Sequence, residues 1–317
     1  MPYLDLLVTD TTGRQLARPI TSGVPVAEGS APEETRFSLL DAEGRAVPVQ
    51  AAVLARWKDG GARWVLLDFQ AAPPASGQLR YRLGWGEGET ASAPAVPAQR
   101  EGDMISAGEL AVTAGGDALL EISGGGQVVF TAEDAEGTVF HAVTDSVEVE
   151  ADGPLRATLA LRGAFRDDAG QRWFSFRLRA SVFAGLSRIY LEPLIIIDAE
   201  QGIIQRVREL SLRVVMSGKA AGASLCGKTA ARLFQIDDQQ YEVDGARMGG
   251  KAPGWAQAGD AAVALRDFWQ QWPKSLEADG DALTIGLFPR FTPGAFAHME
   301  PWHKHEYLFD GDCYRLR

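Results

Sequence analysis

The chain has 317 residues, a length typical of two domains, and 46% of the residues are hydrophobic, which is enough for a buried core. It carries 31 Lys and Arg residues against 42 Asp and Glu, and a formal net charge of −11. This balance excludes the basic surface of a nucleic-acid-binding protein, so we expect no nucleic-acid partner. A local group of Arg and Lys side chains would still allow an anionic sugar to bind.

The start of the chain shows no targeting signal. In "MPYLDLLVTDTTGRQ" no basic segment precedes an apolar one, so the pattern of a signal peptide is missing. The apolar run "IYLEPLIII" is too short to cross a membrane. Cys226 and Cys313 are not spaced like metal ligands; a disulfide between them is one reading, and two reduced thiols are the prediction. We expect a soluble, cytoplasmic protein without a membrane partner.

Apolar and polar residues alternate with a period of two in the first part of the chain, which predicts β-strands at 47–57, 62–70 and 77–85. The segments "KDGG" and "APPAS" between them have the composition of turns. The segment "GEGETASAPAVPAQREG" that follows is rich in Pro, Ala, Gly and Ser and has no apolar period. We therefore expect a β-domain over 1–88, a linker over 89–102 and a second domain over 103–317.

Longer strands are expected after the linker, at 155–165, 171–185, 186–197 and 204–216. In the second of these, the odd-numbered residues from Trp173 to Arg179 would form one face, and the even-numbered residues from Phe174 to Ala180 would face a core. Long strands of this kind predict an all-β fold with a large antiparallel β-sandwich. The one helix expected is short, over 264–272, and ends at a proline.

The strand "RVRELSLRV" carries a strip of basic side chains. With regular alternation, Arg206 and Arg208 share a face with Leu210 and Leu212, and Arg213 lies on the opposite face. Such a strip could receive an acidic sugar, although charged residues on a solvated sheet face are commoner.

Two stretches resemble a known family. They are "VPVQAAVLARWKDGGARWVLLDFQA", within 19–71, and "LRDFWQQWPKSLEADGDALTIGLFPR", over 265–290. Both resemble the exo-rhamnogalacturonan lyase-like (PcRGLX/YetA-like) proteins. The resemblance implies an N-terminal RIFT-type β-barrel, a central β-sandwich and then an (α/α) toroid. The helical periods of a toroid are not found within the chain, so we expect a toroid either to be missing or to be a partner domain outside these residues.

The resemblance implies a polysaccharide lyase that cleaves rhamnogalacturonan, a component of pectin, by β-elimination. A base removes the proton next to a uronate carboxylate, a cation neutralises that carboxylate, and an acid protonates the departing oxygen. The expected partner is a uronate-containing oligo- or polysaccharide, and no cofactor is expected, with a divalent cation left open. Two alternatives are a non-catalytic carbohydrate-binding or scaffold chain, and a glycoside hydrolase using Asp267 and Glu277 as paired carboxylates.

Three of the four histidines lie in "AHMEPWHKHEYLF". If 302–308 is a strand, His303 and His305 share a face, and either could transfer a proton near neutral pH. A metal could instead bind these imidazoles with Glu300 or Glu306, but His-x-His lacks a third ligand at a fixed spacing, so no metal site is predicted. A solvated loop with incidental histidines is the remaining alternative.

The segment "RDFWQQWPK" has the side chains that a carbohydrate cleft needs. Indole rings stack on sugars, amides and carboxylates bind hydroxyls, and cations meet a uronate. We predict that Lys274 or Arg290 neutralises the carboxylate. The predicted sugar-binding residues are Trp269, Gln270, Trp272, Arg266 and Asp267. In the alternative reading, the two tryptophans only pack a short helix against the sandwich.

Overall fold

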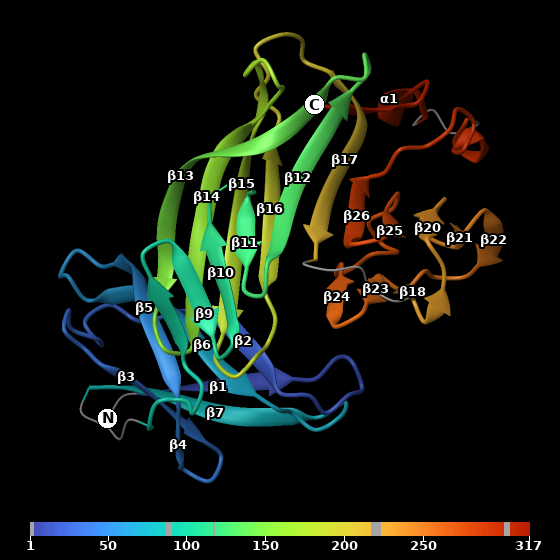
Figure 1. Cartoon of the computed structure of the whole chain (residues 1–317). Coiled ribbons are helices and arrows are strands. Elements are labelled where there is room, and N and C mark those ends of the chain that lie inside the picture. Colours follow the sequence, from blue (N-terminus) through green and yellow to red (C-terminus); the bar gives the residue numbers. More distant parts are fainter. Residues whose placement is uncertain (1–2, 87–90, 117, 217–222, 301–304) are drawn as a thin grey trace. The chain divides into compact units, whose positions relative to one another are not determined.

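A computed structural model describes residues 3–86, 91–116, 118–216, 223–300 and 305–317. These residues form two compact units, each made of segments that are separate in the sequence. One unit comprises Met1–Ala111, Val149–Leu159 and Ser181–Tyr190, and the other comprises Val112–Glu148, Ala160–Ala180 and Leu191–Arg317. Strands β13 (Val139–Asp152), β14 (Arg156–Arg166) and β15 (Arg172–Phe183), labelled in Figure 1, each contribute residues to both units.

The first unit contains two antiparallel sheets. One has the order β1-β7-β3-β4 and the other the order β2-β6-β5. The bounds of these strands are β1 (Tyr3–Thr9), β2 (Arg18–Pro25), β3 (Phe37–Asp41), β4 (Ala46–Val47), β5 (Val49–Arg56), β6 (Ala62–Ala71) and β7 (Gln78–Trp85). Alternate residues of β6, among them Val65, Leu67 and Phe69, are buried in one core with Leu83 of β7. The three strands expected in this part of the chain are therefore confirmed.

Polar side chains of this unit hold its later segments against β5 and β6. The Gln50 side chain accepts hydrogen bonds from the backbone N–H groups of Leu155 (3.0 Å) and Arg156 (2.9 Å) and donates one to the Arg156 carbonyl (3.0 Å). Arg156 also pairs with the buried Asp68 at 2.9 Å. A Cβ atom at Gly153 would collide with the Gln50 amide, so the close approach requires glycine there.

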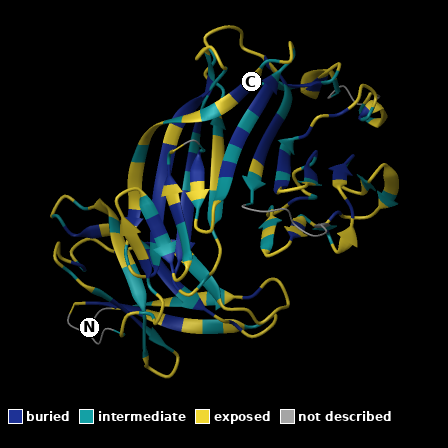
Figure 2. Cartoon of the chain, in the orientation of Figure 1, coloured by how far each residue is buried: buried dark blue, intermediate teal, exposed yellow. Residues whose placement is uncertain are grey.

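In the second unit, the antiparallel neighbours run in the order β12-β17-β26-β25-β20-β21-β22, with β28 also paired to β17. The bounds are β12 (Gly126–Asp134), β17 (Gln205–Val215), β20 (Arg232–Gln235), β21 (Gln240–Val243), β22 (Ala246–Gly249), β25 (Ser275–Asp279), β26 (Ala282–Phe288), β27 (Phe309–Asp310) and β28 (Cys313–Leu316). In β15, Phe174 to Ala180 are buried at even positions, whereas the odd positions stay partly exposed (Figure 2). This confirms the two faces predicted for that strand.

A smaller sheet of the second unit has the order β19-β18-β23-β24. Its strands are β18 (Ala223–Leu225), β19 (Lys228–Thr229), β23 (Trp255–Ala258) and β24 (Ala261–Ala264). The remaining strands of the chain are β8 (Ala98–Glu101), which lies within the range expected as a linker, β9 (Met104–Ala107), β10 (Leu110–Ala114), β11 (Leu120–Ile122) and β16 (Tyr190–Ile196). The helical elements are η1 (Ala297–Met299) and α1 (His305–Leu308).

The prediction of a short helix is wrong. The helix expected over 264–272 is a series of turns, because Asp267 has a φ of 55°, a left-handed value that interrupts a right-handed helix, and Phe268 is drawn into the core. A strand over 302–308, the condition under which His303 and His305 would share a face, is not formed by residues 305–308, which make the single helical turn α1. There the Arg315 guanidinium donates to the carbonyl of Glu306, so this segment is fixed by a side chain of β28.

Among the described residues, none of the helices is long and apolar enough to span a membrane.

Candidate functional site

The described residues of the predicted site all belong to the second unit. They lie in three places: the turn over 266–274, the segment just after β26 at Arg290, and α1 at His305. His303 lies outside the described residues.

The turn over 266–274 presents one indole with polar neighbours. The Trp269 ring is partly exposed and has the Lys251 ammonium 3.9 Å from its centroid, a cation–π contact. The Trp269 carbonyl accepts a hydrogen bond of 3.0 Å from the Gln235 side chain, which fixes the backbone of the turn. Gln270, Arg266 and Asp267 are exposed, and the last two approach each other at 3.6 Å.

Trp272 takes part in packing. Its ring lies 6.1 Å from that of Phe296, which belongs to a buried aromatic cluster. The buried members of that cluster are Phe234, Ile236, Phe291, Phe296, Phe309 and Tyr314. The two tryptophans of the turn therefore differ, since Trp269 has a cation partner and Trp272 contacts the aromatic core.

Lys274 is buried, with 8% of its surface exposed. Its ammonium donates to the Pro273 carbonyl at 3.2 Å and lies 5.3 Å from the centroid of the Phe288 ring. Burial lowers the pKa of Lys274 to about 8, because the charged form loses hydration. Such an amine is poorly placed to meet a carboxylate in solvent, but it can exchange its proton close to neutral pH.

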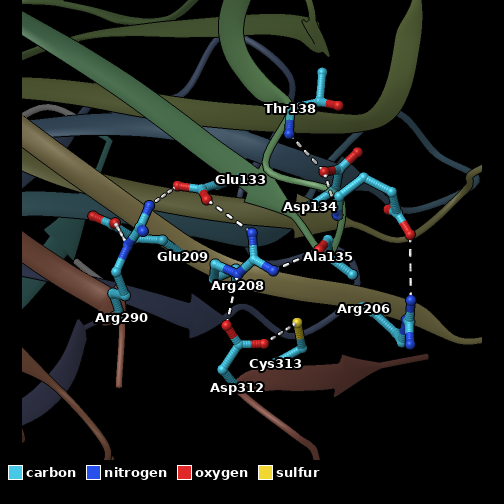
Figure 3. A network of polar contacts seen from close by, with 11 residues as sticks. Glu133, Asp134, Ala135, Thr138, Arg206, Arg208, Glu209, Arg290, Asp312 and Cys313 are labelled. Atoms are coloured by element: carbon cyan, nitrogen blue, oxygen red, sulfur yellow. Dashed lines mark hydrogen bonds and ion pairs between the residues drawn. The ribbon is translucent and has the colours of Figure 1, made fainter. Parts of the chain in front are cut away.

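Arg290 belongs to a network of alternating charges, shown in Figure 3. Its guanidinium pairs with Glu133 and, at 3.5 Å, with Glu209. Glu133 in turn accepts a hydrogen bond of 3.2 Å from Arg208, which also binds Asp312 at 2.9 Å. The network thus connects β12, β17, the segment just after β26 and the residue that precedes β28.

Hydrogen bonding and charge set the protonation of this network. The hydrogen bond to Glu133 raises the pKa of Arg208. Burial tends to raise the pKa of Asp312, but hydrogen bonds from Cys313 and Arg208 and the Arg208 charge outweigh it, so the pKa of Asp312 is lowered. The hydrogen bond to Asp310 likewise raises the pKa of Arg206. Arg206 and Arg208 therefore stay protonated and Asp312 stays ionised near neutral pH.

The regular alternation expected for "RVRELSLRV" is wrong. Val207 is buried between exposed or partly exposed arginines, whereas Leu210, Ser211 and Leu212 are buried consecutively. The pairing of β17 with β12 is irregular: Glu133 lies opposite Glu209, whereas Asp134 lies opposite Val207, so Arg208 is an extra residue in β17. Such a bulge changes which alternate residues face the core. Arg206 and Arg208 consequently do not share a face with a buried Leu212, and they are free to pair with the acidic residues.

The described histidines are not brought together by a common contact. His298 Nε2 lies 3.6 Å from Asp237, and the ring of His305 lies 5.4 Å from that of Phe309. Within the described part of the chain, no three His, Cys, Asp or Glu side chains are grouped as metal ligands. Both Cys226 and Cys313 are free thiols. Of the proposed carboxylate pair, Glu277 binds Arg232 at 3.0 Å and Asp267 contacts Arg266.

The sequence did not indicate Glu133, Lys251 or Gln235, and it did not indicate that Arg208 pairs with Glu133. Arg290 and Glu133 are separated by 157 positions, and Arg208 and Glu133 by 75, so spacing along the chain contains no signal of their pairing. Gln235 is likewise recognised only from strand pairing: its backbone N–H donates to the Lys274 carbonyl at 2.9 Å, and its side chain donates to the Trp269 carbonyl.

Two family models match the chain. The model of the PcRGLX-like N-terminal RIFT barrel domain matches residues 7–84, and the model of the PcRGLX-like protein central beta sandwich domain matches residues 101–220. The regular secondary structure consists almost entirely of β-strands. Together with this, the two models confirm the all-β class and the order of a RIFT-type barrel followed by an antiparallel sandwich. No curated protein matches the chain.

Proposed function

Since the chain belongs to the PcRGLX-like family, we propose that the protein acts on rhamnogalacturonan, as a polysaccharide lyase-related protein that works by β-elimination. The observation that carries the proposal is the match of two consecutive family domains in the family's order. The partner is then a uronate-containing polysaccharide, which offers a carboxylate next to an acidic proton.

In β-elimination, a base removes the proton on the carbon next to the uronate carboxylate. The electron pair of that C–H bond forms the new C=C bond, the C–O bond to the neighbouring sugar breaks, and an acid returns a proton to the leaving oxygen. We assign proton transfer to His303 or His305. His305 is partly exposed on α1, so its imidazole is accessible to a ligand.

Arg290 suits the carboxylate better than Lys274 does. Its side chain is 56% exposed, and a guanidinium has five N–H donors, so a substrate carboxylate can be added beside Glu133 and Glu209. Lys274 is buried and donates to a backbone carbonyl. Sugar contacts are assigned to Trp269 for stacking and to the exposed Gln270, Asp267 and Arg266 for hydroxyl groups.

A specific observation favours the alternative of binding without cleavage. Arg290 already has two carboxylate partners, and Lys274 is buried. A substrate carboxylate would therefore have to compete with Glu133 and Glu209 for Arg290, and it would not reach Lys274 from solvent. In this alternative the same β-domains hold the polysaccharide, and the bond is not broken by this chain.

The test is to incubate the purified chain with rhamnogalacturonan and to follow the ultraviolet absorbance of the unsaturated product. We expect product to form, and the double variant His303→Ala/His305→Ala to lose at least 90% of the rate. His141→Ala, an exposed histidine on β13, is the matched control and should keep the wild-type rate. Saturable binding without product would replace the lyase by the binding alternative, and neither binding nor product would contradict both.

A further inference from the structure

The outer face of the sheet β19-β18-β23-β24 presents one large aromatic side chain among small and neutral ones. Trp255 on β23 is 37% exposed, and Gln257, two residues further on the same strand, is exposed on the same face. Ala264 of β24 lies directly opposite Trp255. A row across the four strands contains Thr229, Ser224, Gln257 and Ala262.

The other face of this sheet belongs to a core, so the face that carries Trp255 points away from that core. Leu225, Ala256 and Ala258 are buried there. Lys228 pairs with Leu225 and places its ammonium 3.8 Å from the Met248 sulfur. The described strand residues of the outer face are therefore uncharged, although 23% of the chain is charged and its net charge is −11.

The Trp255 ring has small neighbours. A Cβ atom at Gly227 would lie 3.9 Å from Cζ2 of Trp255, and Gly227 itself has a φ of 82°, a conformation that favours glycine. The cross-strand neighbour Ala264 carries only a methyl group. Neither position has a side chain long enough to cover the indole, so the ring is accessible from solvent.

We infer that this face of β19-β18-β23-β24 binds neutral sugar units of a polysaccharide, with Trp255 as the stacking residue. The choice of ligand rests on the proposed function. An indole takes the apolar C–H face of a pyranose ring, and the Gln257 amide with the Ser224 and Thr229 hydroxyls can donate to and accept from sugar hydroxyls.

The spacing of the face fits this ligand. Residues two apart on a strand are about 7 Å apart and neighbouring strands about 4.8 Å apart, so a sugar on Trp255 has its hydroxyl groups within reach of the row that contains Gln257. A uronate finds no cation among the strand residues of this face to pair with its carboxylate. Binding should therefore favour neutral sugars over charged ones.

The experiment measures binding of the full chain by calorimetry to three probes: a neutral galacto-oligosaccharide, an oligogalacturonide and a rhamnogalacturonan oligosaccharide. We expect the neutral probe to bind through Trp255, and any binding of the oligogalacturonide, whose carboxylates can meet Arg290, to be unchanged within twofold by Trp255→Ala. Trp255→Ala should weaken binding of the neutral probe at least fivefold, and Trp255→Phe should weaken it less. The matched control is Trp64→Ala, because Trp64 is a similarly exposed indole on β6 of the other unit, and it should stay within twofold of wild type.

Ala264→Arg keeps the inference testable if Trp255→Ala unfolds the chain. The position is exposed on an edge strand, and the long side chain would cover the indole. Equal binding of the neutral probe by wild type and either variant, or no binding of this probe by wild type, overturns the inference. So does a result in which the variants change only self-association, which would identify the face as a contact with a second copy. The proposed function fails separately, if rhamnogalacturonan is neither bound nor cleaved.

Discussion

At Lys274 the ammonium group is buried beside the Phe288 ring and has the Pro273 carbonyl as its acceptor. Burial lowers its pKa to about 8 from an unfolded value of 10.5. The unfolded chain therefore binds more protons than the folded chain between these two values, so this group makes stability rise with pH across that window. Below pH 8 the cost of the buried charge is fully present.

Lys274→Met should remove this cost while keeping a side chain of similar length. We expect the free energy of unfolding at pH 7 to increase by about 2–3 kcal/mol, and the rise in stability between pH 8 and 10.5 to become smaller than in wild type. Urea denaturation across this range measures both effects. Lys58→Met, at an exposed lysine, is the control and should leave the pH dependence unchanged. An unaltered pH dependence in Lys274→Met would contradict the assignment.

At the scale of elements, the two halves of β17 are stabilised differently. Arg206 and Arg208 in its first half form ion pairs, whereas Leu210 and Leu212 in its second half pack in the core. Glu133 receives both Arg208 and Arg290, and its side chain is only 12% exposed. Glu133→Gln removes the charge and leaves two guanidinium groups without their shared carboxylate. We expect a loss of about 1–3 kcal/mol in the free energy of unfolding, because partly buried polar groups lose their partner. Chemical denaturation of the variant measures this loss.

Asp310→Asn provides the comparison for that prediction. The Arg206–Asp310 pair is about half exposed on both sides and 3.4 Å long. Solvent screening makes such a pair worth less than about 1 kcal/mol, so the variant should differ little from wild type. A loss in Asp310→Asn as large as that in Glu133→Gln would show that burial of the network does not determine its contribution.

At the scale of the whole molecule, the first unit depends on segments that arrive from later parts of the chain. Gln50 binds two backbone N–H groups and one carbonyl of the segment around Leu155 and Arg156. Gln50→Ala leaves these backbone groups without their partner, and we expect a loss of about 2–4 kcal/mol in stability. Thermal unfolding followed by circular dichroism measures the change. Gln99→Ala, at an exposed position of β8, should change stability by no more than about 0.5 kcal/mol, and equal losses in the two variants would contradict this role of Gln50.

The sequence by itself determined the class of the fold and much of its local detail. Alternation is a property of neighbouring residues, so the strands β5, β6 and β7 and the two faces of β15 could be predicted from it. The resemblance identified the family that the two domain models confirm; of the two stretches that carried it, 19–71 lies within a matched range and 265–290 lies outside both. The composition of the segment with Trp269 and Gln270 also marked it as a candidate site, although it was expected to be a short helix and forms turns.

Only the tertiary structure decided which of these residues are available for chemistry. Burial of Lys274, the partners of Arg290 and the change of face within β17 all depend on which strands lie next to one another, and strand pairing joins positions far apart in the sequence. Likewise, Asp267 has a left-handed φ and Phe268 lies in the core, so this segment forms turns instead of the expected helix. A period in the sequence fixes which side of a strand is apolar, whereas contacts between distant segments fix which charges meet.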